Sequence, residues 1–103
     1  MNSQNFHISL PCNNIQETKK FYQNQLGFEI GRSSFSWFDV NIMGNQITFT
    51  IDEKAKIKTT NYEFEDAWIP SFHFGVIVDE ETWGELFNKH NREPYFIKSS
   101  TPF

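Results

Sequence analysis

Hydrophobic and polar residues alternate along the first half of the chain, and this alternation predicts β-strands. In residues 6–10, 34–43 and 46–52, apolar side chains occupy every second position, which is the period of a half-buried strand. Residues 28–32 predict a further short strand. Gly44-Asn45 separates two alternating stretches and predicts the turn of a hairpin.

One segment between these strands has helical rather than strand spacing. Apolar residues in 14–26 recur at intervals of three and four, so they share one face of an amphipathic helix. Asn13 or Asn14 would cap its first turn, and Gly27 suits the left-handed residue that follows a helix end. The first half of the chain is therefore predicted to have the order βαβββ.

The second half of the chain predicts fewer elements. Residues 53–69 are polar and charged without a clear period and predict a linker loop. A strand over 71–79 follows, and Asp79 would cap a helix that ends before Pro94. Residues 95–97 predict a short final strand.

The two halves align without a gap when the sequence is shifted by 66 positions. Residues 5–34 then fall on 71–100, so that His7 meets His73 and Asn13 meets Asp79. The common register of strand, cap, helix and strand favours an internal duplication. The alternative is that any two βαβ units would align in this way.

Composition narrows the classes of function. The chain of 103 residues is predicted to form one domain, and twelve Phe, three Trp and three Tyr supply large rings for a core, a pocket or an interface. A formal charge of -4 without a basic run disfavours nucleic-acid binding. Cys12 is the only cysteine, which excludes an intrachain disulfide and a cysteine-rich metal site. No signal peptide or membrane-length apolar run is found, so a cytoplasmic protein is expected.

Several short segments resemble one known family. They are the strand Phe6–Pro11, the helical pair Phe21-Tyr22, the turn Leu26-Gly27-Phe28, and the strand Phe72–Val76. Over residues 5–100 the chain resembles the glyoxalase/bleomycin resistance/dioxygenase superfamily, also called vicinal oxygen chelate proteins. The resemblance implies an α+β fold of tandem βαβββ modules around a cavity. Module one would span about 5–52, the linker about 53–70, and a shortened module two about 71–103.

The resemblance also implies a possible divalent metal (Zn, Ni, Mn or Fe). His7 and His73 match the first-strand ligand positions of the two modules and are the candidate metal ligands. The alternative is that each is an ordinary hydrogen-bonding residue on the polar side of its strand. Two departures bear on this site. The family ligand on the last strand of module one would fall at Thr48 or Thr50, and threonine is a poor metal ligand. By the same offset, the last two strands of module two would lie beyond Phe103. A homodimer is expected, because a partner chain would cover the edges that this shortening exposes.

Candidate pocket residues come from the polar face of the strands and from side chains that could contact a ligand. They are Ser9, Arg32, Trp37, Thr48, Thr50 and Trp68. Ser9, Thr48 and Thr50 share a polar face that would line a cavity, or alternatively form a solvated face of the sheet. Arg32 would clamp an anionic substrate, or alternatively pair with Glu29 or Asp39. The two tryptophans would stack on a flat ligand, or alternatively pack in a core or interface. The catalytic residues are not identified by the sequence.

Three functions remain open at this point. The first is a small-molecule-binding protein with possible metal-dependent lyase, isomerase or dioxygenase chemistry. The second is a metal-free dimer that binds or sequesters a ligand, as bleomycin-resistance relatives do. The third is a catalytically inactive interaction protein.

Overall fold

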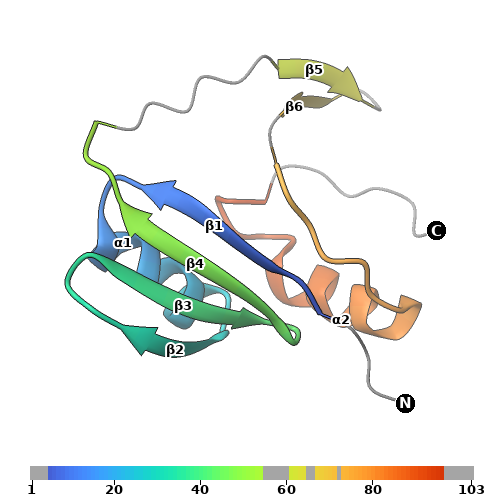
Figure 1. The fold of residues 1–103 in the computed structure, drawn as a ribbon. Coiled ribbons are helices and arrows are strands. Elements are labelled where there is room, and N and C mark those ends of the chain that lie inside the picture. The colour runs from blue at the N-terminus through green and yellow to red at the C-terminus, as the bar shows by residue number, and fades with distance from the viewer. Residues whose placement is uncertain (1–4, 55–60, 65–66, 72, 97–103) are drawn as a thin grey trace. The chain divides into compact units, whose positions relative to one another are not determined.

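A computed structural model describes residues 5–54, 61–64, 67–71 and 73–96 (Figure 1). The chain divides into two compact units, Met1–Ile57 and Lys58–Phe103. The elements in chain order are β1 (His7–Cys12), α1 (Ile15–Lys20), a π-helical turn η1 (Phe21–Gln25), β2 (Glu29–Ser33), β3 (Trp37–Ile42), β4 (Asn45–Ile51), β5 (Asn61–Phe64), β6 (Ala67–Pro70) and α2 (Glu80–His90).

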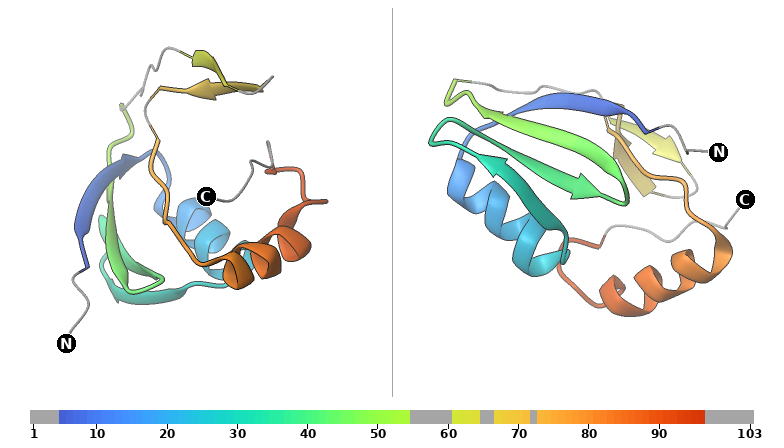
Figure 2. Two further views of the ribbon diagram at one scale, coloured as in Figure 1. Left: turned by 90° about the vertical axis from the view of Figure 1, so that its right-hand side faces the viewer. Right: turned by 60° about the horizontal axis from the view of Figure 1, so that its bottom comes forward.

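The first unit is a four-stranded sheet with one helical segment against it. The strand order is β1-β4-β3-β2, in which β1 runs parallel to β4 and the other neighbours are antiparallel. Helix α1 contacts β3 and β4 and covers one face of the sheet (Figure 2). The predicted βαβββ order and the α+β fold class are confirmed.

The core of this unit lies between the sheet and α1. β3 contributes Phe38, Val40 and Ile42, while β4 contributes Ile47 and Phe49, all of them buried. The Phe38 and Phe49 rings stack with their centroids 5.4 Å apart. The predicted alternation in β3 and β4 is confirmed, because every second residue faces the helix and the residues between face away.

Local signals set where the helix begins and ends. The side chain of Asn14 accepts a hydrogen bond from the backbone N–H of Glu17 at 2.9 Å, so Asn14 rather than Asn13 is the cap. The helix continues through η1 to Gln25, and Gly27 follows with φ +76°. The helix predicted over 14–26 and its glycine stop are confirmed.

The β3–β4 hairpin turns one residue earlier than predicted. Ile42 pairs with Asn45, so the two turn residues are Met43 and Gly44, with φ of +52° and +89°. A two-residue turn with positive φ at both positions matches the twist of the strands. The side chain of Asn41 supports the turn by accepting the Gly44 N–H at 2.7 Å.

The second unit differs from its prediction in several elements. β5 and β6 form an antiparallel hairpin from Asn61 to Pro70, so the prediction of a loop over 53–69 was wrong. Acidic residues around Glu63 hide the alternation of this short hairpin in the sequence. Within the described part of 71–79, residues 73–79 have no strand assignment, so the strand predicted there was also wrong.

Helix α2 begins where predicted. The carboxylate of Asp79 accepts the backbone N–H of Thr82 at 2.7 Å, and the helix ends at His90, before Pro94. Tyr95 and Phe96 lie in a turn rather than a strand, closed by the N–H of Phe96 donating to the Glu93 carbonyl at 3.0 Å. Position 97 lies outside the described residues. Among the described helices, none is long and apolar enough to cross a membrane.

The helix caps of the two halves are 65 positions apart, whereas His7 and His73 are 66 apart. The caps are Asn14 and Asp79, so the aligned pair of Asn13 with Asp79 is off by one residue. The duplication itself stays a prediction.

Candidate functional site

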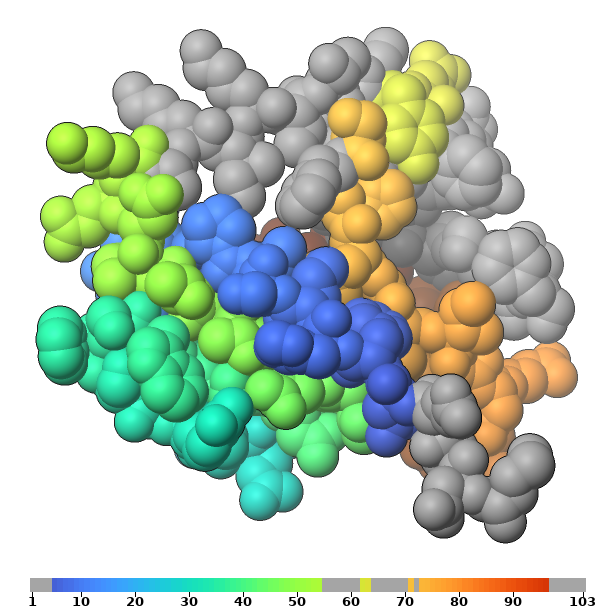
Figure 3. Space-filling model, viewed as in Figure 1, coloured from blue at the N-terminus to red at the C-terminus, as the bar shows by residue number. Residues whose placement is uncertain are grey.

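The sheet of the first unit has a polar face on the side away from α1. Strand register places Ser9 beside Thr48 and Thr48 beside Asp39, while Trp37 lies beside Thr50 one row further. These side chains alternate with the apolar core residues of their strands, so they share the face opposite the core. In Figure 3 this polar face is directed toward the viewer, with β1 in blue and β3 and β4 in green.

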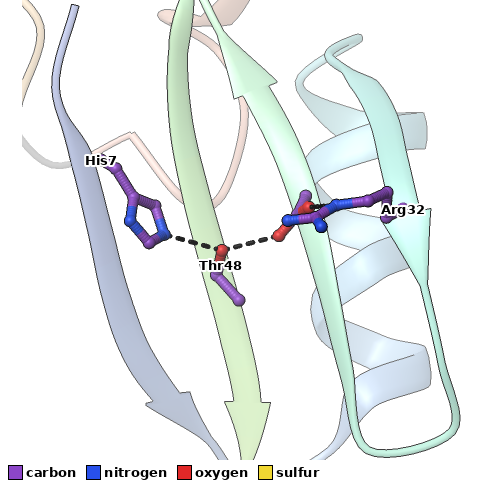
Figure 4. Close-up of polar contacts among 4 residues, drawn as sticks. His7, Arg32 and Thr48 are labelled. Atoms are coloured by element: carbon purple, nitrogen blue, oxygen red, sulfur yellow. Dashed lines mark hydrogen bonds and ion pairs between the residues drawn. The ribbon is translucent and has the colours of Figure 1, made fainter.

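A line of polar contacts crosses all four strands on this face. The Nε–H of Arg32 donates to Oδ2 of Asp39 at 2.8 Å, and the hydroxyl of Thr48 donates to Oδ1 of Asp39 at 2.6 Å. The Nε2 atom of His7 lies 3.0 Å from the Thr48 hydroxyl oxygen. Figure 4 shows this sequence of side chains from β1 to β2. We call these four residues the polar line.

The contacts determine which nitrogen of His7 carries a proton. A hydroxyl has one hydrogen to donate, and that of Thr48 goes to Asp39. The Nε2 of His7 must therefore be the donor in its contact with Thr48. In the neutral ring this leaves Nδ1 of His7 as a lone-pair acceptor.

A bulge in β2 brings Arg32 onto the polar face. Ile30 pairs with Val40 and Ser33 with Phe38, so both Gly31 and Arg32 stand opposite the single residue Asp39. An extra residue of this kind re-aims the side chains that follow it. Of the two partners left open by the sequence, Glu29 and Asp39, Arg32 therefore pairs with Asp39.

Asp39 is a buried carboxylate held in its ionised form. The residue is 6% exposed, whereas the side chain of its partner Arg32 is 74% exposed. Desolvation by itself would raise the pKa of Asp39, but hydrogen bonds from Thr48 and Arg32, with the charges of Arg32 and His7, outweigh it and lower the pKa. The guanidinium of Arg32 also lies 5.5 Å from the centre of the Trp37 ring, which limits its movement.

A hollow of about 310 Å³ adjoins the Arg32 end of the polar line. Its lining includes Gly31, Arg32 and Asp39, with Asn41 and Gln46 beyond them. The hollow extends from the bulge toward the β3–β4 turn.

The structure brings together six of the eight residues that the sequence singled out. Those six, all on the sheet of the first unit, are His7, Ser9, Arg32, Trp37, Thr48 and Thr50. Trp68 belongs to β6 and His73 to the extended segment before α2, both in the second unit. Their role in a shared pocket stays a prediction.

Sequence reasoning did not identify Asp39 and Asn41 as site residues. Aspartate and asparagine are uncommon in the middle of strands. Their presence at alternate positions of β3, opposite Thr48 and Gln46, is the signal that would have identified them.

The residues of the first unit do not by themselves fit a divalent metal. The polar line offers one imidazole, and both oxygens of Asp39 already accept hydrogen bonds. Within the described residues, no three His, Cys, Asp or Glu side chains lie close enough together to hold a metal ion. A site made by His7 and His73 stays a prediction.

Comparison with known proteins identifies the family to which this fold belongs. Residues 5–92 match the model of the Glyoxalase/Bleomycin resistance protein/Dioxygenase superfamily. A crystal structure titled as a glyoxalase/bleomycin resistance protein/dioxygenase from Alicyclobacillus acidocaldarius is similar, with TM-score 0.69 and 19% identity over 86% of this chain. The chain spans 62% of that protein's length.

A second solved structure has the same fold. It is an integron cassette protein from the mobile metagenome of the Halifax Harbour sewage outfall, with TM-score 0.64 and 15% identity, and the match covers 90% of this chain and 72% of that one. No curated protein sequence matches the chain.

Proposed function

Because the chain belongs to the Glyoxalase/Bleomycin resistance protein/Dioxygenase superfamily, we propose that it binds a small molecule on the polar face of its four-stranded sheet. Membership supports a general ligand-binding role. The observation that carries the proposal is the polar line, which ends in an exposed cation at Arg32 and an exposed imidazole at His7.

The polar line prepares this face for a ligand. Asp39 and Thr48 form hydrogen bonds with neighbouring side chains, and these bonds fix the rotamers of Arg32 and His7 at the two ends of the line. Trp37 offers an aromatic surface on the same face, one row away. A flat ligand with oxygen or nitrogen atoms at its rim fits these groups, since the ring supplies contact area and the two ends supply hydrogen bonds.

A purely structural role for the polar line is the competing interpretation. Arg32, Asp39 and Thr48 join three adjacent strands, and a buried ion pair of this kind can serve only to hold strand register. His7, Ser9 and Thr50 are exposed on the same face, and holding the strands in register does not require their side chains. Their presence favours ligand binding over a purely structural role.

Metal-dependent lyase, isomerase or dioxygenase chemistry would need more metal ligands than this face supplies. A divalent ion, when bound, would act as a Lewis acid on a ligand oxygen. His7 would be one ligand of such an ion, and its second protein ligand would be His73. The binding proposed for the polar face is independent of that ion.

Titration with a set of planar heteroaromatic compounds in the presence of EDTA tests the proposal. We expect at least one compound to raise the melting temperature in a saturable way, and Trp37→Leu to weaken its binding roughly 2- to 10-fold, the range expected for aromatic contacts. Phe35→Leu is the matched control, because Phe35 is 96% exposed and belongs to the loop before β3 rather than to a strand of the sheet.

The outcome against the proposal would be no stabilisation by any compound, or equal losses in Trp37→Leu and Phe35→Leu. Repeating the titration with Ni, Zn or Mn in place of EDTA distinguishes metal-free from metal-dependent ligand binding. Tighter binding that is lost in His7→Ala would support the metal-dependent form.

We also propose that the protein forms a homodimer. β1 and β2 are the edge strands of the sheet, so each pairs with one neighbour within the described part of the first unit. Unpaired edges readily take up a strand from another chain. Sedimentation velocity at micromolar concentration is expected to give the mass of two chains, and a single species of 12.2 kDa would contradict the proposal.

A further inference from the structure

The groups around the hollow identify one class of ligand. We propose that the hollow beside the Met43–Gly44 turn binds the carboxylate end of a small molecule, with the guanidinium of Arg32 and the side-chain amide of Asn41 as donors. This inference rests on the proposed function and names the chemistry of its ligand.

Arg32 has hydrogen-bond donors that Asp39 does not occupy. Its Nε–H is used on Asp39, and the guanidinium carries two terminal amino groups besides. The side chain is 74% exposed while the nearby Trp37 ring and Asp39 hold its plane in place. A planar fork of N–H groups matches the two oxygens of a carboxylate.

Asn41 presents a donor to the same hollow. Its Oδ1 accepts the backbone N–H of Gly44 at 2.7 Å, so the other end of the amide must be the NH₂ group. The next asparagine differs, because Asn45 accepts from the N–H of Phe6 and donates to the Ile42 carbonyl, both at 3.2 Å. Asn45 is therefore used within the fold, whereas the NH₂ group of Asn41 remains for a ligand.

The charged acceptor in the lining of the hollow, the carboxylate of Asp39, is already used. Both oxygens of Asp39 receive a hydrogen bond, one from Thr48 and one from Arg32. The ion pair of Arg32 and Asp39 is balanced in charge, so recognition depends on directed N–H donors more than on net charge. A group with two acceptor oxygens complements this arrangement better than a cation or an amide does.

One acidic residue near the hollow opposes anion binding and provides a test. Glu29 pairs with Asn41 across β2 and β3, so its side chain shares the face of Asn41. Its negative charge would weaken the binding of a carboxylate. Glu29→Gln is therefore expected to strengthen that binding, which a site for cations or neutral ligands would not show.

Benzoate and benzamide form a matched pair of probes, since they share a ring and differ in the charge and acceptors of one group. We expect benzoate to shift the backbone amide resonances of Gly31 and Gly44 in a saturable titration, and benzamide to bind at least about tenfold more weakly. Arg32→Lys keeps the charge beside Asp39 but loses the fork, and is expected to weaken benzoate binding about tenfold.

Two further variants complete the test. Glu29→Gln is expected to strengthen benzoate binding about two- to fivefold, the size of an exposed charge interaction. Lys20→Gln removes a positive charge from α1, on the other face of the sheet, and is expected to leave benzoate binding unchanged. Circular dichroism of each variant shows that the fold is retained.

The outcomes separate this inference from the proposed function. Equal binding of benzoate and benzamide, benzoate binding indifferent to Arg32→Lys, or no shift of Gly31 and Gly44 would overturn the carboxylate assignment. If neutral heteroaromatic compounds still bind the polar face, the proposed function survives that failure. If neither benzoate nor any compound of the set binds, both are wrong.

Discussion

Replacing Phe38 with alanine is expected to lower the free energy of unfolding by about 3–5 kcal/mol. Phe38 is fully buried, stacks on Phe49, and lies beneath the ammonium group of Lys19, 5.7 Å from its ring centre. Truncation removes the buried ring and leaves a cavity that the sheet and helix cannot fill. Since small domains have a total stability of about 5–15 kcal/mol, this loss is a large fraction of it.

Urea denaturation followed by tryptophan fluorescence measures the change. Phe35→Ala is the matched control, because the same substitution three residues earlier removes a ring that is 96% exposed. That variant is expected to change the free energy of unfolding by less than about 0.5 kcal/mol. Similar losses in the two variants would mean that Phe38 is not part of the core.

Replacing Thr48 with valine is expected to cost about 1–3 kcal/mol of stability at neutral pH. Valine has nearly the same shape, but it cannot donate to Oδ1 of Asp39 or accept from Nε2 of His7. The buried carboxylate then loses one of its two partners. Thr50→Val is the control, because Thr50 lies on the same strand and face but is exposed.

The pH dependence of this cost identifies its source. The hydrogen bond from Thr48 helps to lower the pKa of Asp39, so it stabilises the fold above the ordinary aspartate pKa of about 4. That stabilisation is lost as the pH falls through the lowered native value. Urea unfolding at pH 7 and at about pH 3 should show a smaller difference between Thr48→Val and the native protein at the lower pH. An equal difference at the two values would rule out the carboxylate as the source.

Much of the candidate site could be predicted from the sequence. Alternation placed Trp37, Thr48 and Thr50 on the polar side of their strands, and the structure places them there. His7 and Ser9 followed from the same reasoning on the first strand. What the alternation could not supply is the order of strands, and with it the fact that Asp39 and His7 contact Thr48 from opposite sides.

Arg32 shows the limit of periodic reasoning most clearly. The pairing of Ile30 with Val40 puts Ile30 on the core side, and strict alternation would turn Arg32 to the core as well. The bulge reverses this, because one extra residue shifts the side chains that follow it to the other face. A bulge depends on how two strands fit against each other, so no local pattern in β2 could reveal it.

The second unit shows a different limit. The cap of α2 at Asp79 followed from the sequence, because a cap is a contact between residues three apart. The β5–β6 hairpin was missed, since its acidic residues resemble those of a loop and its strands have four residues each. Short strands are defined by their pairing more than by their composition.

The sequence by itself determined the helices, the cap of α2, the glycine after η1 and the faces of β3 and β4, and it narrowed the cap of α1 to Asn13 or Asn14. Each of these depends on side-chain period, backbone dihedral angles or hydrogen bonds within a few residues of the chain. Only the tertiary structure decided that β1 lies beside β4, that the bulge turns Arg32 onto Asp39, and that Asp39 is a buried, ionised group between Arg32 and Thr48. Those features depend on the pairing of strands distant in sequence, where burial and charge act between residues that no local pattern connects.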